Sequence, residues 1–344
     1  MKKIFLYLVL VSALLALIIG YFAFTSTTKF TSKSTTFIID NINKQQISNL
    51  LVEKNIISNK TVFLWIGNAV GIWEKIKPGK YEVKKGESII GIIKMLKNGR
   101  LAESKLVINK LRVKEDFAKL VSKNFSTDSV TVMQFLTSTD SLKMYAVDTN
   151  TVFTLFIPDT YAFYWNTPLR KIMNKLNEAK NNFWNNNNRL EKSKAIGLSP
   201  ENIYILASIV EEETNYKEDR AKIASVYINR LHKNMPLQAC PTIKYAMKDF
   251  ALTRIYEKYL VNPSPYNTYR VKGLPPGPIC TPSPKCIDLV LNAPQTDYLF
   301  FVANANFDGY HHFSTNYAEH NKYAIEYQKA LDLYTAKKKE KNSK

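Results

Sequence analysis

The chain has 344 residues, of which 45% are hydrophobic and 22% charged, a composition typical of a globular protein with two or three domains. Three cysteines are too few for a disulfide scaffold. The 48 Lys and Arg exceed the 29 Asp and Glu by 19 charges, which favours an anionic membrane or a carboxylate-rich polymer as partner. The sequence has no Arg-rich arm and no zinc finger, so we do not expect nucleic acid as a partner.

Residues 4–24 form an uncharged apolar run that can cross a hydrocarbon core of about 30 Å as a helix. Lys2 and Lys3 precede it, so the positive-inside rule places residues 1–3 in the cytoplasm and the body of the chain on the extracytoplasmic side of the cell (inner) membrane. The run exceeds the apolar core of about 7–15 residues found in cleaved signal peptides, and no A-x-A-like site follows. We therefore expect an uncleaved single-pass signal anchor, followed by a Ser/Thr/Lys-rich linker at 25–34.

The sequence at 35–104 predicts a small α+β module. Their apolar pattern predicts, in order, a strand, two helices, a strand and a third helix, at 36–39, 45–54, 61–70, 81–83 and 87–96. The turn at 77–80 and the helix after it resemble LysM-like glycan-binding modules. A spacer without a binding role explains the same residues nearly as well.

A larger mixed α/β domain is predicted at 105–335, before a basic tail at 336–344, so that the fold class of the whole chain is α+β. A strand at 105–108 and helices near 114–121 and 131–136 begin this domain. Polar and aromatic motifs concentrate after residue 195, where we expect the chemistry.

Residues 199–202 (SPEN) predict the start of a helix, with Ser as the N-cap, Pro in the first turn and an acid after it. At about 100° per residue, Glu213 falls on the apolar face of this helix, whereas Glu212 points to the opposite side and Glu211 lies at the edge. The apolar face is formed by Ile203, Leu206, Ala207, Ile209 and Val210.

A carboxyl group on an apolar face near a helix C-terminus is costly to ionise, because desolvation and the helix dipole both raise its pKa. Glu213 is therefore a candidate general acid that keeps its proton near neutral pH. The alternative, about equally favoured by periodicity alone, is that Glu213 pairs with Arg220 or Arg230 and only braces the fold.

A series of short motifs runs through the chain from residue 158 onward. They are 158–161 (PDTY), 207–214 (ASIVEEET), 220–231 (RAKIASVYINRL), 235–238 (MPLQ), 241–245 (PTIKY), 266–269 (YNTY), 273–279 (GLPPGPI), 281–282 (TP), 298–303 (YLFFVA), 311–315 (HHFST) and 319–321 (EHN). With these motifs, nearly the whole chain resembles the endolytic murein transglycosylases, the MltG or YceG-like family, and most specifically at 201–322. The signal anchor and the LysM-like module also fit the family. Before residue 150 the resemblance is one of architecture only.

The resemblance implies a lyase that cuts the β-1,4 bond between N-acetylmuramic acid and N-acetylglucosamine within nascent peptidoglycan strands. The cut leaves 1,6-anhydro-muramyl ends and would end glycan elongation. The Glu that directly precedes Thr in the family's motif is the catalytic acid and base, here Glu213. The implied partners are peptidoglycan strands, the membrane and the peptidoglycan synthases of the elongation machinery, and no cofactor is implied.

Nine further residues are candidates for substrate binding, because amides suit sugar hydroxyls and tyrosine rings suit the faces of pyranoses. Each of them could instead be a core or turn residue. They are Glu211, Asn229, Gln238, Tyr245, Tyr266, Asn267, Tyr269, Pro276 and His311. The four histidines lack metal-ligand spacing, so we expect no metal site.

Three features depart from the family pattern or leave a question open. Cys240 stands where the family usually has Asp, and Phe153 and Thr154 replace a usual Glu-Gly pair. Cys280 and Cys286 could pair in an oxidising compartment.

Two other functions remain open from the sequence: a non-catalytic wall-binding scaffold, and a muramidase that uses water.

Overall fold

The computed structural model describes residues 2–252 and 255–342, and the described chain divides into two compact units. The first unit holds the described residues up to Leu106 together with Lys123–Thr127 and Ala162–Pro168, and the second unit holds the rest. Two short segments that the sequence assigned to the larger domain therefore belong to the first unit. Residue 1 of the predicted cytoplasmic terminus and residues 343–344 of the predicted tail lie outside the described residues.

Helix α1 (Lys2–Phe24) contains one segment, Ile4–Phe24, that is long and apolar enough to cross a membrane. The predicted linker that follows, residues 25–34, is not a free tether. Thr27 is buried, its backbone N–H donates to the carbonyl of Glu87 at 2.9 Å, and its hydroxyl lies 3.0 Å from that of Ser58. Because its polar groups find partners inside the folded module, this segment is an ordered connection.

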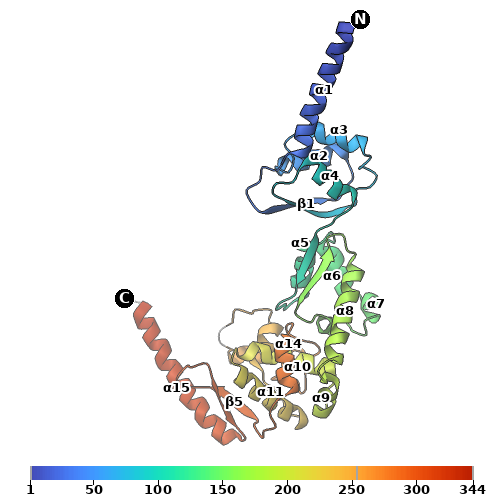
Figure 1. Ribbon diagram of the computed structural model, residues 1–344. Coiled ribbons are helices and arrows are strands. Elements are labelled where there is room, and N and C mark those ends of the chain that lie inside the picture. The colour runs from blue at the N-terminus through green and yellow to red at the C-terminus, as the bar shows by residue number, and fades with distance from the viewer. Residues whose placement is uncertain (1, 253–254, 343–344) are drawn as a thin grey trace. The chain divides into compact units, whose positions relative to one another are not determined.

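Two antiparallel strands and three helices form the body of the first unit, in the order that the sequence predicts (Figure 1). Alternate strand residues point into the core, where the rings of Phe37 and Tyr81 stack 5.5 Å apart. Asn43, Asn59 and Ser88 cap the three helices with their side-chain oxygens. The elements are β1 (Ser34–Ile39), α2 (Lys44–Glu53), α3 (Lys60–Ala69), β2 (Gly79–Lys84) and α4 (Ile89–Lys97).

A second pair of strands, β3 and β4, and a series of helices occupy the middle of the chain. The elements are β3 (Glu103–Val107), α5 (Lys114–Asn124), α6 (Ser129–Thr137), α7 (Thr139–Lys143), the 3-10 helix η1 (Val152–Leu155), β4 (Thr160–Tyr164), α8 (Leu169–Asn185) and α9 (Arg189–Ile196). The last part of the chain contains α10 (Pro200–Glu213), α11 (Lys217–His232), α12 (Cys240–Ala246), α13 (Glu257–Leu260), α14 (Pro284–Leu291), β5 (Phe300–Ala303), β6 (His311–Ser314) and α15 (Tyr317–Asn342).

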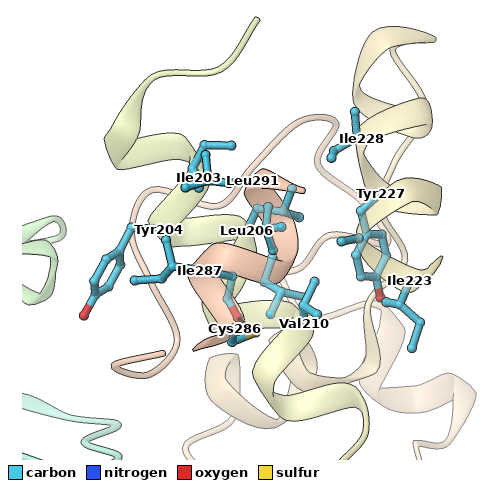
Figure 2. Packing of buried hydrophobic residues seen from close by; sticks show 14 of the residues in the cluster. Ile203, Tyr204, Leu206, Val210, Ile223, Tyr227, Ile228, Cys286, Ile287 and Leu291 are labelled. Atoms are coloured by element: carbon cyan, nitrogen blue, oxygen red, sulfur yellow. Dashed lines mark hydrogen bonds between the residues drawn. The ribbon is translucent and has the colours of Figure 1, made fainter. Parts of the chain in front are cut away.

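The core of the second unit is built around α10, which packs against α11 and α14 (Figure 2). The sequence predicted one apolar face for this helix, but every residue from Ile203 to Val210 is buried. Neighbouring elements cover its other sides, so that even the polar groups of Tyr204 and Ser208 are enclosed and donate to backbone carbonyls. The helix therefore reaches the surface only at its two ends, and its last turn carries three glutamates.

Candidate active site

Helix α10 begins as its sequence predicts. The hydroxyl of Ser199 accepts a hydrogen bond from the N–H of Asn202, and Pro200 occupies the first turn. The helix ends at Glu213, because Thr214 adopts an extended conformation with φ −151°. Glu211, Glu212 and Glu213 follow one another in the last turn, about 100° apart around the axis, so each faces different neighbours.

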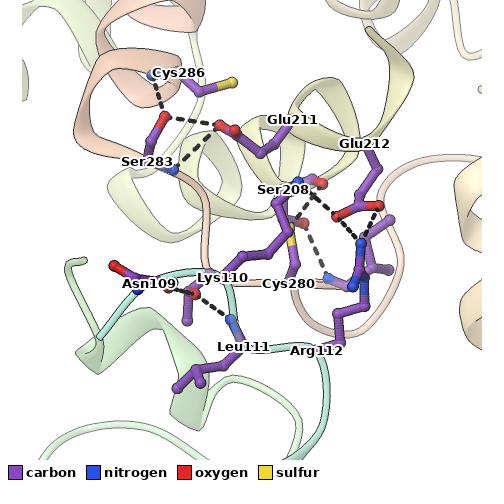
Figure 3. Close-up of polar contacts among 12 residues, drawn as sticks. Asn109, Lys110, Leu111, Arg112, Ser208, Glu211, Glu212, Cys280, Ser283 and Cys286 are labelled. Carbon is purple, nitrogen blue, oxygen red and sulfur yellow. Dashed lines mark hydrogen bonds and ion pairs between the residues drawn. The ribbon is translucent and has the colours of Figure 1, made fainter. Parts of the chain in front are cut away.

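Glu211 is bound into the fold by two elements. One carboxylate oxygen lies 3.2 Å from the guanidinium of Arg220 on α11. The other oxygen accepts hydrogen bonds from the backbone N–H and the hydroxyl of Ser283, at 3.2 and 2.8 Å (Figure 3). Both partners of the ion pair are largely buried, with side-chain exposures of 13% and 10%. Glu211 therefore ties α10 to α11 and to the start of α14, rather than offering free oxygens to a substrate.

Glu212 is held by two cations from a distant segment. Lys110 lies 3.0 Å from one carboxylate oxygen, and Arg112 donates to both oxygens at 3.1 and 3.0 Å (Figure 3). Leu111, between them, exchanges hydrogen bonds with Thr281, which fixes the segment beside the end of α10. Burial raises the pKa of Glu212, but the hydrogen bonds from Arg112 and Lys110 outweigh it, so the pKa is lowered overall. Glu212 is therefore ionised, and the positive charges of Lys110 and Arg112 balance its negative charge.

Glu213 has no such cation. Among the described residues it forms no ion pair, and its hydrogen-bond partner is the phenol of Tyr227 on α11, which donates to Oε1 at 2.5 Å. The two arginines considered as partners are engaged elsewhere: Arg220 pairs with Glu211, and Arg230 donates to backbone carbonyls, that of Leu299 at 2.6 Å among them. The bracing alternative thus applies to Glu211 and not to Glu213.

Burial raises the pKa of Glu213 from 4.5 to about 7. The hydrogen bond from Tyr227 and the positive charge of Lys244 act in the opposite direction, and the negative charge of Glu212 adds to the rise. The carboxyl group is therefore about half protonated at neutral pH, so it can give up a proton and take one back in the same pH range.

Helix α12 and the loop after it bring further polar groups near Glu213. The thiol of Cys240 lies 3.1 Å from the hydroxyl of Tyr269, and burial raises the pKa of both groups. Gln238 precedes α12 in a left-handed conformation with φ +54°, and its exposed side chain accepts a hydrogen bond from Arg230 at 3.3 Å. Of the predicted binding residues, Tyr269 contacts Cys240 and lies within electrostatic range of Glu213, and Gln238 lies two residues before Cys240 in the chain.

Tyr245 and Tyr266 lie together, with ring centroids 4.7 Å apart. They line a pocket of about 240 Å³ that also contains Lys114 and Lys248. Tyr245 follows Lys244 on α12, and the positive charge of Lys244 acts on Glu213, whereas Glu213 itself is not among the residues that line this pocket. The two predicted stacking rings are thus brought together at this pocket.

Four predicted residues are placed differently. Asn267 is fully buried, and its NH₂ group donates to the carbonyls of Leu260 and Asn262, so it holds its own loop. Asn229, His311 and Pro276 are likewise not gathered around Glu213 by any contact. The amide of Asn229 donates to the carbonyls of Thr296 and Tyr298, His311 lies 2.8 Å from the buried carboxylate of Asp219, and Pro276 is exposed in its turn.

Sequence reasoning missed Tyr227 and Lys244. A tyrosine in the middle of an apolar helix was the available signal for Tyr227, because a buried phenol needs a hydrogen-bond partner. Cys280 and Cys286, which could have paired, are separate buried thiols. Within the part of the chain that the structure describes, no three His, Cys, Asp or Glu side chains are grouped so as to hold a metal ion.

The family model described as the YceG-like family matches residues 37–326. The endolytic murein transglycosylase of Bacillus subtilis (strain 168) is 38% identical over 189 residues, which is 54% of this chain and 48% of that protein. The endolytic murein transglycosylase of Streptococcus pneumoniae serotype 2 is 25% identical over 320 residues, 83% of this chain and 56% of that protein. The chain thus spans about half the length of these curated relatives.

Among solved structures, the crystal structure of a YceG-like protein from Listeria monocytogenes is similar to this chain. The TM-score is 0.56 and the sequence identity 27%, and the match covers 85% of this chain and 99% of that one.

Proposed function

Because the chain belongs to the YceG-like family, we propose that it is an endolytic lytic transglycosylase that cuts glycan strands of peptidoglycan, with Glu213 as its catalytic residue. One observation carries the proposal: of three consecutive glutamates, Glu213 alone forms no ion pair among the described residues, and burial raises its pKa to about 7. A carboxyl group in this state is suited to general acid catalysis at neutral pH.

The reaction needs one carboxyl group acting twice. Protonated Glu213 gives its proton to the glycosidic oxygen, the bond from this oxygen to C1 of the muramyl residue breaks, and N-acetylglucosamine leaves with a free 4-hydroxyl. The muramyl 6-hydroxyl oxygen then bonds to C1, and its proton passes to the Glu213 carboxylate. Glu213 is thereby restored, and the product ends in a 1,6-anhydro ring without any water having been consumed.

The neighbours of Glu213 support this use. Ordinary glycosidases need a second free carboxylate as nucleophile or base. Here Glu211 and Glu212 are held in ion pairs, so neither is free to serve as that second group. Attack by the 6-hydroxyl of the same muramyl residue requires no second carboxylate, which favours a transglycosylase over a muramidase that uses water.

Substrate binding is proposed for Gln238, for Tyr269 near Glu213 and for the Tyr245–Tyr266 pair at its pocket. These side chains offer one amide and three phenols to sugar hydroxyls, and aromatic faces to sugar rings. The catalytic domain is assigned to 105–335, and a LysM-like role in holding the glycan to 35–104. The span at 4–24 would keep the protein in the cell membrane with its body on the extracytoplasmic side, within reach of peptidoglycan synthases.

Mass spectrometry of the products from uncrosslinked glycan strands tests the proposal. We expect the wild type to form anhydro-muramyl ends and Glu213→Gln to form none. Reducing muramyl ends would identify a muramidase instead. Binding of the strands without any cleavage would favour the non-catalytic scaffold, and cleavage by Glu213→Gln at the wild-type rate would remove the catalytic assignment.

A further inference from the structure

We propose that Tyr227 is a positioning residue, which holds Oε1 of Glu213 so that the other oxygen, Oε2, delivers and recovers the proton. The proposal rests on the proposed function of Glu213. Its basis is the geometry of one hydrogen bond, from a buried phenol on α11 to the last residue of α10.

Tyr227 is well placed to act as a fixed donor. Its side chain is 1% exposed, and its ring meets that of Phe301 on β5 edge to face, with centroids 5.8 Å apart and planes at 79°. Phe301 in turn packs against His311, which is held by Asp219. The phenol therefore cannot swing away without disturbing a packed aromatic layer.

The direction of the hydrogen bond follows from the chemistry of the two groups. Burial raises the pKa of Tyr227 well above its ordinary value, so the phenol stays neutral and keeps its hydrogen. It donates this hydrogen to Oε1. A carboxyl proton is then better carried by Oε2, for which no hydrogen bond or ion pair is seen within the described residues. One oxygen of Glu213 is thus anchored, and the other is available to substrate.

Four titratable groups besides Tyr227 act electrostatically on Glu213. Glu212 lies on the same helix, Cys240 and Lys244 come from α12, and Tyr269 comes from the loop after α13. Tyr227 differs from these groups because it touches the carboxyl group directly and favours its ionised form. Its hydroxyl should strengthen Glu213 as an acid in the first step and still allow the proton to return in the second.

The test is the pH dependence of kcat/KM for Tyr227→Phe, in the full-length protein on uncrosslinked glycan strands. Activity requires protonated Glu213 and should fall in the wild type above a midpoint near pH 7. Hydrogen bonds to charged groups change an ionisation constant about 10- to 100-fold, so the midpoint should rise by about one to two pH units in the variant.

Tyr204→Phe is the matched control. Tyr204 is also a buried tyrosine of this core, but its hydroxyl donates to the carbonyl of Phe156 at 2.7 Å, away from Glu213. This variant should lose stability and keep the wild-type midpoint. A purely structural role for the Tyr227 hydroxyl predicts the same behaviour for both variants, and an unmoved midpoint in Tyr227→Phe would overturn the proposal.

A second measurement does not depend on turnover. The carboxyl C=O band of Glu213, isolated by subtracting the infrared spectrum of Glu213→Gln, can be titrated in wild type and in Tyr227→Phe. A higher titration midpoint in the variant is expected, and equal midpoints would contradict the role of Tyr227. If Glu213→Gln itself stayed active, the proposed function would fail; if it were inactive while both midpoints stayed equal, only the role of Tyr227 would fail.

Discussion

The folded protein should bear an energetic cost for keeping the ionised carboxyl group of Glu213 desolvated, and Glu213→Gln should remove that cost. In the unfolded chain the carboxyl group ionises near 4.5, whereas burial raises the pKa of Glu213 to about 7 in the fold. A group whose pKa is raised on folding contributes full stability below pH 4.5, and this contribution is lost as the pH rises through 7. At about 1.4 kcal/mol per pH unit, the loss is about 3 kcal/mol by pH 8.5.

Glutamine keeps the shape of the side chain and can still accept the hydrogen bond from Tyr227, but it does not titrate. The difference in unfolding free energy between Glu213→Gln and the wild type should therefore shift by about 3 kcal/mol in favour of the variant between pH 4.5 and pH 8.5. The same substitution should lower strand cleavage by about 10²- to 10⁴-fold or more, because one group serves as both acid and base.

Thiol labelling provides an assay that is specific to the second unit. Cys280 and Cys286 are fully buried beside α10, so each reacts only when this core opens. Pulsed labelling across a urea series, read by mass spectrometry of each peptide, gives the unfolding free energy at each pH. A difference between wild type and Glu213→Gln that stays constant from pH 4.5 to 8.5 would refute the reasoning, and so would unfolding of the variant at every pH.

Three more outcomes are expected. Glu211→Gln should cost about 3 kcal/mol of stability in the same assay, because it leaves the largely buried guanidinium of Arg220 without its carboxylate; a loss below about 1 kcal/mol would contradict this. Gly277→Ala should cost about 1–3 kcal/mol, since a Cβ at this position would lie 2.1 Å from the carbonyl oxygen of Asn150, and an unchanged urea midpoint would speak against it. Alkylation of Cys240, an exposed residue near Glu213, with a bulky maleimide should block strand cleavage, after a long reaction time because the pKa of its thiol is raised; full turnover by the modified protein would place the substrate elsewhere.

Local structure could be read from the sequence at the positions where short-range patterns decide it. The uncharged run at 4–24, the order of elements in the first unit and the Ser199 cap all follow from residues within a few positions of one another. The helical period also placed Glu213 on the apolar side of α10, and burial there is what raises its pKa.

Partners that come from distant parts of the chain could not be predicted in the same way. The cations of Glu212 lie 102 and 100 residues before it, at 110 and 112, and the hydroxyl that binds Glu211 lies 72 residues after it. Which of three adjacent glutamates stays without a cation depends on how these segments pack, and helical periodicity carries no such information.

The sequence by itself thus determined the apolar N-terminal helix, the helical framework and the family of this protein, because these depend on local periodicity and on motifs. Only the tertiary structure decided that Glu211 and Glu212 are compensated, that Asn267 turns its amide inward, and that Tyr227 meets Glu213. The physical reason is that desolvation, ion pairing and hydrogen bonding act through space, between side chains whose distances are set by the packing of the whole unit.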